Sequence, residues 1–170
     1  MTLYVITESF FGNTRRIGEV IATELDVVLY GAASAPTDFA DGDAVIVGAP
    51  THNGRLPTPA TREKALAMEG ARMYDNCAGL LEWLEEVRGN GSSVRAAAFD
   101  TVVPGGAWFG SAAKRSVKKL KRIGFQVDTP AEHFLVAGTP PVLRDGELVH
   151  ARDWAARLAE RWQVGYCTLP

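Results

Sequence analysis

Short apolar runs rich in β-branched residues alternate along this chain with segments whose apolar residues recur at helical spacing. Because these runs carry few polar residues on either face, the strands they predict are buried on both sides, as in a parallel sheet covered by helices. Alternation of strand and helix then implies helical crossovers between parallel strands. The expected strands are residues 3–6, 27–30, 43–49, 94–99 and 134–136, and the expected helices are residues 14–25, 59–69, 79–87, 111–122 and 146–162.

The length suits one domain of ordinary size, and we expect residues 1–170 to form a single unit. Hydrophobic residues make up 46% of the chain, and its net charge of -2 lacks the basic excess expected of a nucleic-acid-binding protein. Apolar runs are too short to cross a bilayer, and the first residues carry no basic signal-peptide region. We therefore expect a cytoplasmic protein without membrane insertion. Cys77 and Cys167 have no CxxC spacing, so no metal site or redox motif is expected.

In an open parallel sheet, ligands bind beyond the carboxyl ends of the strands, where the strand order reverses. The first loop at that edge, residues 7–14, leads directly into a helix, whose N-terminus offers unpaired N–H groups to a phosphate. Gly12 allows close backbone approach, and Ser9 and Thr14 add hydroxyl donors. Asn13 suits a tight turn and offers its amide. No P-loop lysine follows, so we predict a phosphate site of another kind; the alternative is an ordinary turn with a threonine cap.

The second loop, residues 50–57, is framed by prolines, and Gly54 allows a left-handed conformation. Thr51, Asn53 and the loop amides suit the polar edge of a planar ring. His52 has no metal-spaced partner, so it is predicted to position a ligand rather than bind a metal. Arg55 is either a ligand contact or a solvated surface charge.

The third loop, residues 100–111, is long for a connection between a strand and a helix. It places Trp108 and Phe109 side by side among glycines. An aromatic residue on such a loop is a candidate stacking platform for a flat ring. We expect at least one of the two to pack onto the sheet edge.

Six cations crowd the helix expected at residues 111–122, where they form either a solvated face or a docking patch for an acidic partner. The other residues singled out are expected to be structural: Glu82, Glu85 and Glu86 on a helix surface, Trp83, Trp154 and Trp162 in the core, and His133 and His150 with no partner visible in the sequence.

Taken in order, the three loops carry a family resemblance. Residues 5–14, a strand followed by Ser-Phe-Phe-Gly-Asn-Thr, resemble the phosphate loop of flavodoxins. Residues 48–52, Gly-Ala-Pro-Thr-His, resemble the second flavin loop, and residues 99–101 before a serine-led basic helix resemble the third. The resemblance covers nearly the whole chain and is greatest with small single-domain flavodoxin-like proteins of actinobacteria. It implies a Rossmann-like α/β fold: a doubly wound, five-stranded parallel sheet in the order 2-1-3-4-5 with helices on both faces.

The resemblance also implies flavin mononucleotide (FMN) as the cofactor, with residues 9–14 around the phosphate, residues 50–55 beside the isoalloxazine ring, and Asp100 and Thr101 on the other side of the ring. The expected cofactor-binding residues are Ser9, Phe10, Phe11, Gly12, Asn13, Thr14, Pro50, Thr51, His52, Asn53, Gly54, Arg55, Asp100, Thr101 and Trp108.

Two departures from the family pattern stand out. Phe11 replaces a threonine often found before Gly-Asn-Thr, which removes one hydroxyl donor. Arg15 and Arg16 follow the motif where many flavodoxins carry an acidic residue. Many flavodoxins are also strongly acidic, which serves docking to basic partners, whereas this chain has a net charge of only -2.

The resemblance implies an electron-transfer flavoprotein that exchanges electrons with partner redox proteins and needs no catalytic residue of its own, because the flavin carries the chemistry. One alternative is an FMN-dependent NAD(P)H or quinone oxidoreductase, favoured by the weak acidity and by His52. It ranks lower because the chain has no second Gly-rich dinucleotide fingerprint. The other alternative is a binding module that has lost its flavin, favoured by Phe11 and the two arginines.

Overall fold

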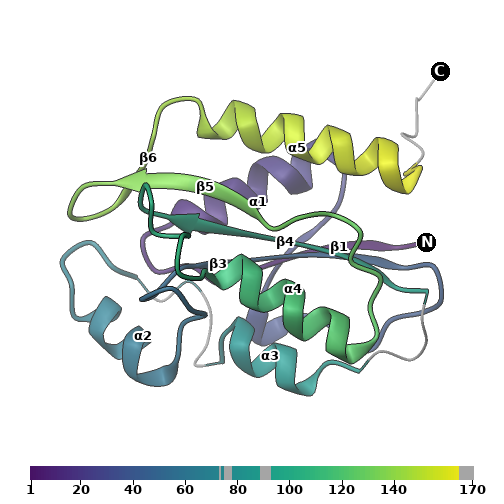
Figure 1. Cartoon of the computed structure of the whole chain (residues 1–170), viewed down its shortest axis with the longest axis horizontal. Coiled ribbons are helices and arrows are strands. Elements are labelled where there is room, and N and C mark those ends of the chain that lie inside the picture. The colour runs from purple at the N-terminus through teal and green to yellow at the C-terminus, as the bar shows by residue number, and fades with distance from the viewer. Residues whose placement is uncertain (73, 75–77, 89–92, 165–170) are drawn as a thin grey trace.

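The computed structural model describes residues 1–72, 74, 78–88 and 93–164. In this part of the chain, six strands form one sheet in the order β2-β1-β3-β4-β5-β6, with helices on both faces (Figure 1). The strands are β1 (Leu3–Thr7), β2 (Leu29–Gly31), β3 (Ala44–Pro50), β4 (Arg95–Val102), β5 (Glu132–Ala137) and β6 (Val142–Leu143). The helices are α1 (Asn13–Glu24), the 3-10 turn η1 (Ala32–Ser34), α2 (Pro59–Leu66), α3 (Leu80–Glu86), α4 (Ala112–Ile123) and α5 (Glu147–Trp162).

The first five strands pair in parallel in the order 2-1-3-4-5, so the predicted fold class and strand order are confirmed. The sixth strand, β6, was not predicted. It pairs antiparallel with the end of β5, through the partners Val136 with Leu143 and Ala137 with Val142. With only two residues, β6 is too short to produce a detectable periodicity.

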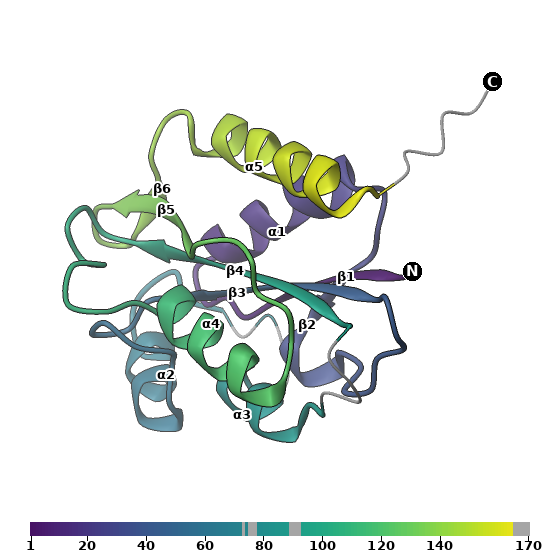
Figure 2. The same ribbon diagram turned by 45° about the vertical axis from the view of Figure 1, so that its right-hand side comes forward.

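The helices divide between the two faces of the sheet (Figures 1 and 2): α1 and α5 lie on one face, and α3 and α4 on the other. The first pair covers a core that includes Ile17, Ile21 and Leu158, and the second pair covers a core that includes Leu84 and Leu120. Full burial of one such side chain contributes about 1.5–3 kcal/mol. Burial on both faces explains why β3 reads as a continuous apolar run. The predicted core tryptophans Trp83, Trp154 and Trp162 are all buried.

Helix α4 begins and ends where the sequence signals place it. The Ser111 hydroxyl accepts a hydrogen bond from the Lys114 N–H at 3.2 Å, and Gly124 ends the helix at a positive φ of 102°. Helix α2 starts at Pro59, as expected, but ends at Leu66, earlier than predicted.

The carboxyl end of β4 lies further along the chain than predicted. Asp100 and Thr101 belong to β4 rather than to the following loop, and both are buried. Neighbouring β3 meets β4 closely here, because a Cβ on Gly48 would lie 2.1 Å from the Phe99 ring. This contact requires glycine at position 48.

No helix among the described residues is long and apolar enough to cross a membrane. The two cysteines, Cys77 and Cys167, lie outside the described residues.

Candidate functional site

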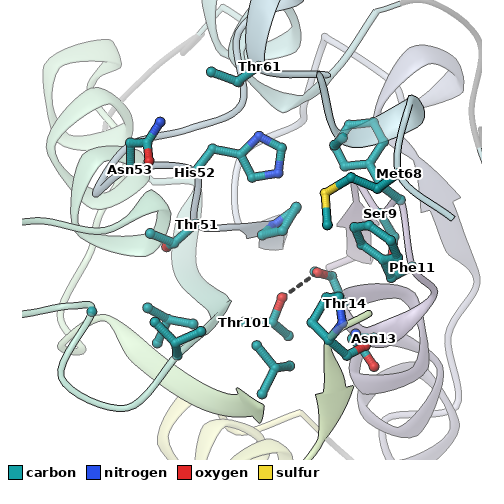
Figure 3. A pocket seen from close by; sticks show the side chains of 18 of the residues that line it. Ser9, Phe11, Asn13, Thr14, Thr51, His52, Asn53, Thr61, Met68 and Thr101 are labelled. Carbon is teal, nitrogen blue, oxygen red and sulfur yellow. Dashed lines mark hydrogen bonds between the residues drawn. The ribbon is translucent and has the colours of Figure 1, made fainter. Parts of the chain in front are cut away.

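A cavity of about 550 Å³ lies at the carboxyl end of the sheet, between the start of α1, the loop after β3, helix α2 and the loop after β4 (Figure 3). This is the edge at which an open parallel sheet binds ligands. Its lining comprises Ser9, Phe10, Phe11, Asn13, Thr14, Pro50, Thr51, His52, Asn53, Gly54, Thr61, Lys64, Ala65, Met68, Thr101, Val102, Val103, Gly106, Val136, Gly138, Thr139 and Pro141.

Eleven of the fifteen residues expected from the sequence line this cavity, and Gly12, Arg55, Asp100 and Trp108 do not. Sequence reasoning missed the contribution of α2 and of Met68, two residues after its end. It also missed the lining residues at the end of β5 and in the turn to β6, such as Pro141. The sequences of α2 and of the turn between β5 and β6 contain no binding motif. These segments reach the cavity because of how the chain crosses over between strands.

We call residues 9–14, the loop that leads into α1 and is a candidate for binding an anion, the anion seat. None of their backbone N–H groups donates to another described residue, and the Ser9 hydroxyl has no partner among them. Gly12 adopts a left-handed φ of 82°, which turns the loop into the helix. Unpaired amides at a helix N-terminus, with the positive end of the helix dipole, favour a bound anion.

Two side-chain contacts hold this loop against the rest of the sheet. The Thr14 and Thr101 hydroxyls lie 2.8 Å apart, as the dashed line in Figure 3 marks. The Asn13 amide donates to the Pro141 carbonyl at 2.8 Å. The Asn13 amide, expected as a ligand donor, therefore ties the start of α1 to the turn before β6.

The segment after α2 covers the outer side of the same loop. The Arg72 N–H donates to the Phe10 carbonyl at 2.7 Å. A Cβ on Gly12 would lie 2.8 Å from the Tyr74 hydroxyl oxygen. Tyr74 therefore lies against the loop at Gly12, while the positive φ is what favours glycine there.

The loop after β3 is a tight turn closed by reciprocal backbone hydrogen bonds between His52 and Arg55, at 2.9 and 3.1 Å. Asn53 and Gly54 both have positive φ, of 51° and 73°. The turn presents the His52 ring to the cavity, and the Phe10 ring lies beside it at a centroid distance of 5.5 Å. Arg55 is exposed.

Burial lowers the pKa of His52 to about 4, and the positive charge of Arg62 acts in the same direction. His52 is therefore neutral at pH 7. It offers the cavity one ring donor or acceptor and no charge.

Asp100 is buried and holds residues of the cavity wall in place through hydrogen bonds. Its carboxylate accepts hydrogen bonds from the Thr51 hydroxyl at 3.0 Å and from the Ala113 N–H at 2.9 Å. It also pairs with His133 Nδ1 at 2.8 Å, so His133 has the partner that the sequence did not reveal. Thr51 in turn accepts from the Ala112 N–H at 2.9 Å, which joins the β3 loop to the start of α4.

A buried carboxylate lies directly before the anion seat. Glu8 is almost fully buried, and its carboxylate accepts hydrogen bonds from Arg62 Nε at 2.8 Å and from the Leu80 N–H at 2.9 Å. Burial raises the pKa of Glu8 to about 7, although Leu80 and Arg62 act against the rise. A Cβ on Gly79 would lie 2.5 Å from this carboxylate, so glycine is required there.

Arg62 also binds Glu82, which corrects the expectation that Glu82 is a plain surface residue. The Gly79 N–H donates to Glu82 at 2.9 Å. Partial burial acts to raise the pKa of Glu82, but the hydrogen bonds from Arg62 and Gly79 outweigh it and lower the pKa. Arg62 thereby links the end of β1 to α2 and α3.

Two further expectations were wrong. Trp108 and Phe109 are 83% and 94% exposed, so neither packs onto the sheet edge. His150 is not without partners, since it contacts Glu132 through Nε2 at 2.7 Å and Glu147 through Nδ1 at 3.1 Å.

The cavity combines an anion seat at one end with a body lined largely by apolar and neutral polar side chains. This arrangement suits a ligand with a phosphate and a flat, largely apolar ring system. No cluster of three or more potential metal-binding side chains occurs among the described residues.

Comparison with protein-family models finds no match, and no curated protein sequence matches. Solved structures do match over almost the full length. An archaeal flavodoxin is 18% identical, with a TM-score of 0.64, and 96% of this chain and 99% of that one are covered. Oxidised flavodoxin 1 from Bacillus cereus is 16% identical, with a TM-score of 0.65, and 94% of this chain and 98% of that one are covered.

A short-chain flavodoxin associated with a bacterial microcompartment is 13% identical, with a TM-score of 0.66, over 95% of this chain and 99% of that one. Identities this low establish a shared architecture. Together with the strand order 2-1-3-4-5 and the cavity at the switch point, they show that this chain has a flavodoxin-like fold.

Proposed function

We propose that this chain binds FMN in the cavity and transfers electrons through it to and from a redox partner protein. The observation that carries this proposal is that the backbone N–H groups of residues 9–14 have no partner among the described residues, beside a cavity of about 550 Å³. A phosphate at the start of α1 would place the attached ring system in the body of the cavity. When bound, FMN supplies the redox chemistry.

The phosphate would be held by the loop amides and the Ser9 hydroxyl. The Thr14 hydroxyl, 2.8 Å from that of Thr101, keeps the loop at a fixed distance from β4. None of residues 9–14 is a lysine or an arginine, so dipoles and neutral donors of this loop would carry its part in binding the phosphate.

At the ring end, His52 remains neutral at pH 7, because its pKa is lowered to about 4. Phe11, Met68, Val102 and Val103 add apolar surface, and Figure 3 shows Phe11 and Met68 on one side of the cavity and His52 above it. An apolar site disfavours added negative charge, which would lower the potential of the second reduction step. No side chain is needed as an acid or a nucleophile.

The proposal is tested by titrating purified, flavin-free protein with FMN and with riboflavin, which lacks the phosphate. We expect quenching of FMN fluorescence and a yellow complex, with FMN bound at least about 10-fold more tightly than riboflavin, because charge-assisted hydrogen bonds contribute about 1.5–3 kcal/mol each. Absence of FMN binding would overturn the proposal, and equal affinity for the two flavins would overturn the phosphate seat.

A second candidate function, an FMN-dependent NAD(P)H or quinone oxidoreductase, is favoured by the position of Lys64 in the cavity lining. A cation beside a flavin favours the negative charge that full two-electron reduction adds. Anaerobic mixing of the FMN-loaded protein with NADPH or NADH separates the two candidates. We expect no bleaching of the flavin within minutes, and rapid bleaching would favour the reductase.

A further inference from the structure

The segments that line the cavity carry large apolar side chains that the fold leaves exposed. Eight large hydrophobic residues are exposed in the described part of the chain, and five belong to segments that border this cavity. Together they form the apolar rim: Met68, Val103, Trp108, Phe109 and Val142. Exposed aromatic residues gathered at one place are typical of a binding surface, whereas single exposed apolar residues are not.

The segment that carries the two aromatics also concentrates positive charge. Residues 103–124 contain six of the 18 lysines and arginines and none of the 20 aspartates and glutamates, although the whole chain has a net charge of -2. All six lie on α4. The chain is therefore strongly asymmetric in charge, and its positive side begins beside the cavity.

Within the described part of the chain, five of these six cations have no acidic partner. Lys119 pairs with Glu85 of α3 at 3.5 Å. Lys114 donates to the Ala107 carbonyl at 2.7 Å, and Ala107 directly precedes Trp108 in the loop after β4. Arg115 and Lys118 are exposed and form no ion pair in the described structure, and the same holds for the two cations at the end of the helix.

The start of α4 is fixed to the cavity wall, since the Ala112 N–H donates to Thr51, which lines the cavity. Arg115 and Lys118, in the first two turns of the helix, follow Trp108 and Phe109 within ten residues of chain. Glu63 and Glu69, which are exposed, belong to α2 and the residues after it and not to the segment of the two aromatics.

We propose that the apolar rim and the basic face of α4 form a docking surface for a protein partner whose own surface is rich in carboxylates. The proposal deepens the electron-transfer function above and rests on it. The aromatics supply contact area beside the cavity, and the cations steer and orient an acidic partner. This polarity is opposite to that of strongly acidic carriers that dock basic partners.

Two other occupants fit the same surface less well. A second copy of this chain would bring the same cations to the interface, where like charges repel. A lipid surface would favour a helix free to insert its apolar face. The apolar face of α4, with Ala112, Ala113 and Leu120, is buried against the sheet instead.

The test measures binding of an acidic [2Fe–2S] ferredoxin by isothermal titration calorimetry, with basic cytochrome c for comparison, using the protein with and without FMN. We expect ferredoxin to bind and cytochrome c to bind at least about 10-fold more weakly at low salt, and the ferredoxin affinity to fall steeply as NaCl increases, because exposed charges are screened. Since binding is also measured without FMN, its failure is distinct from failure of the flavin assignment.

Matched variants locate the surface. Arg115→Glu should weaken ferredoxin binding by roughly 5-fold or more. The control is Arg157→Glu, because Arg157 is exposed on α5 and likewise forms no ion pair in the described structure. It should change ferredoxin binding by less than about 2-fold. Trp108→Ala should weaken it without changing its salt dependence. Equal effects of both charge reversals would overturn the proposal, as would stronger binding of cytochrome c. It would also be overturned by binding to vesicles of anionic phospholipid, or by dimerisation that Trp108→Ala abolishes, in place of ferredoxin binding.

Discussion

Arg62 Nε donates to Glu8 Oε1 at 2.8 Å, and this buried ion pair joins helix α2 to the end of β1, next to the anion seat. The side chains of the pair are 10% and 4% exposed. A second ion pair of the same kind, from Arg15 Nε to Glu19 Oε1 at 2.9 Å, lies on the surface of α1 with side chains 40% and 51% exposed. The two pairs share chemistry and distance and differ in burial.

Arg62→Met should therefore destabilise the protein by about 1–3 kcal/mol, because the buried Glu8 carboxyl loses its hydrogen-bond partner. Arg15→Met should cost less than about 0.5 kcal/mol, because water screens the exposed pair. Urea unfolding of both variants at pH 7 measures the difference. Similar losses of unfolding free energy for the two variants would contradict this reading of the Arg62 pair.

The raised pKa of Glu8 makes stability depend on pH in a definite direction. Its pKa is about 7 in the folded protein against 4.5 when unperturbed, so the folded state holds the proton more tightly. This contribution is fully present below pH 4.5 and is lost as the pH rises through 7. Glu8→Gln removes it, so the stability of this variant relative to the wild type should increase by about 3 kcal/mol between pH 4.5 and pH 8.

Urea unfolding across this pH range checks the expectation. Glu63→Gln, an exposed neighbour of Arg62 on α2, serves as the control and should leave the pH profile of the wild type unchanged. A constant difference between Glu8→Gln and the wild type at every pH would contradict the proposed titration of Glu8.

His52 acts in the opposite direction. Its pKa is lowered from 6.5 to about 4, so its contribution to stability is present above pH 6.5 and is lost as the pH falls toward 4. NMR titration of the ring should show a neutral imidazole down to about pH 5. Arg62→Met should raise the His52 pKa only in part, because burial, the larger cause, remains. A ring that titrates near 6.5 in the wild type would show that it is solvated rather than held in the cavity wall.

The architecture could be predicted because its signals are local. Apolar runs mark the strands, and the Ser111 cap and Gly124 mark the ends of α4. The residues between a strand and a helix identified in this way are the loops. The position of residues 9–14 is likewise set locally, since they run from the loop after β1 into the first turn of α1.

The rest of the site depends on contacts between distant segments. Glu8 and Arg62 are 54 positions apart, and neither lies in a pattern that predicts the other. The sequence predicts Asp100 in a loop, because polar residues usually end a strand. In the structure Asp100 belongs to β4, where its carboxylate is paired by contacts with Thr51, Ala113 and His133. At least one of Trp108 and Phe109 was expected to pack onto the sheet edge, because large aromatics are usually buried, and the exposure of both became visible only in three dimensions.

Gly12 and Gly42 offer a matched test of the anion seat, because both have a positive φ, of 82° and 84°. Alanine at either position incurs a similar backbone strain of about 1–2 kcal/mol. A Cβ at Gly42 meets open space. Gly12 belongs to the loop whose amides would hold the phosphate, and a Cβ there lies 2.8 Å from the Tyr74 hydroxyl.

Gly12→Ala should therefore weaken FMN binding by roughly 10-fold or more, because the displaced loop amides lose charge-assisted hydrogen bonds. Riboflavin binding should fall less, because riboflavin has no phosphate for this loop to hold. Gly42→Ala should leave both affinities within about 2-fold, because its strain lies away from the cavity. Fluorescence titration with both flavins measures these affinities, and an unchanged FMN affinity in Gly12→Ala would place the phosphate elsewhere.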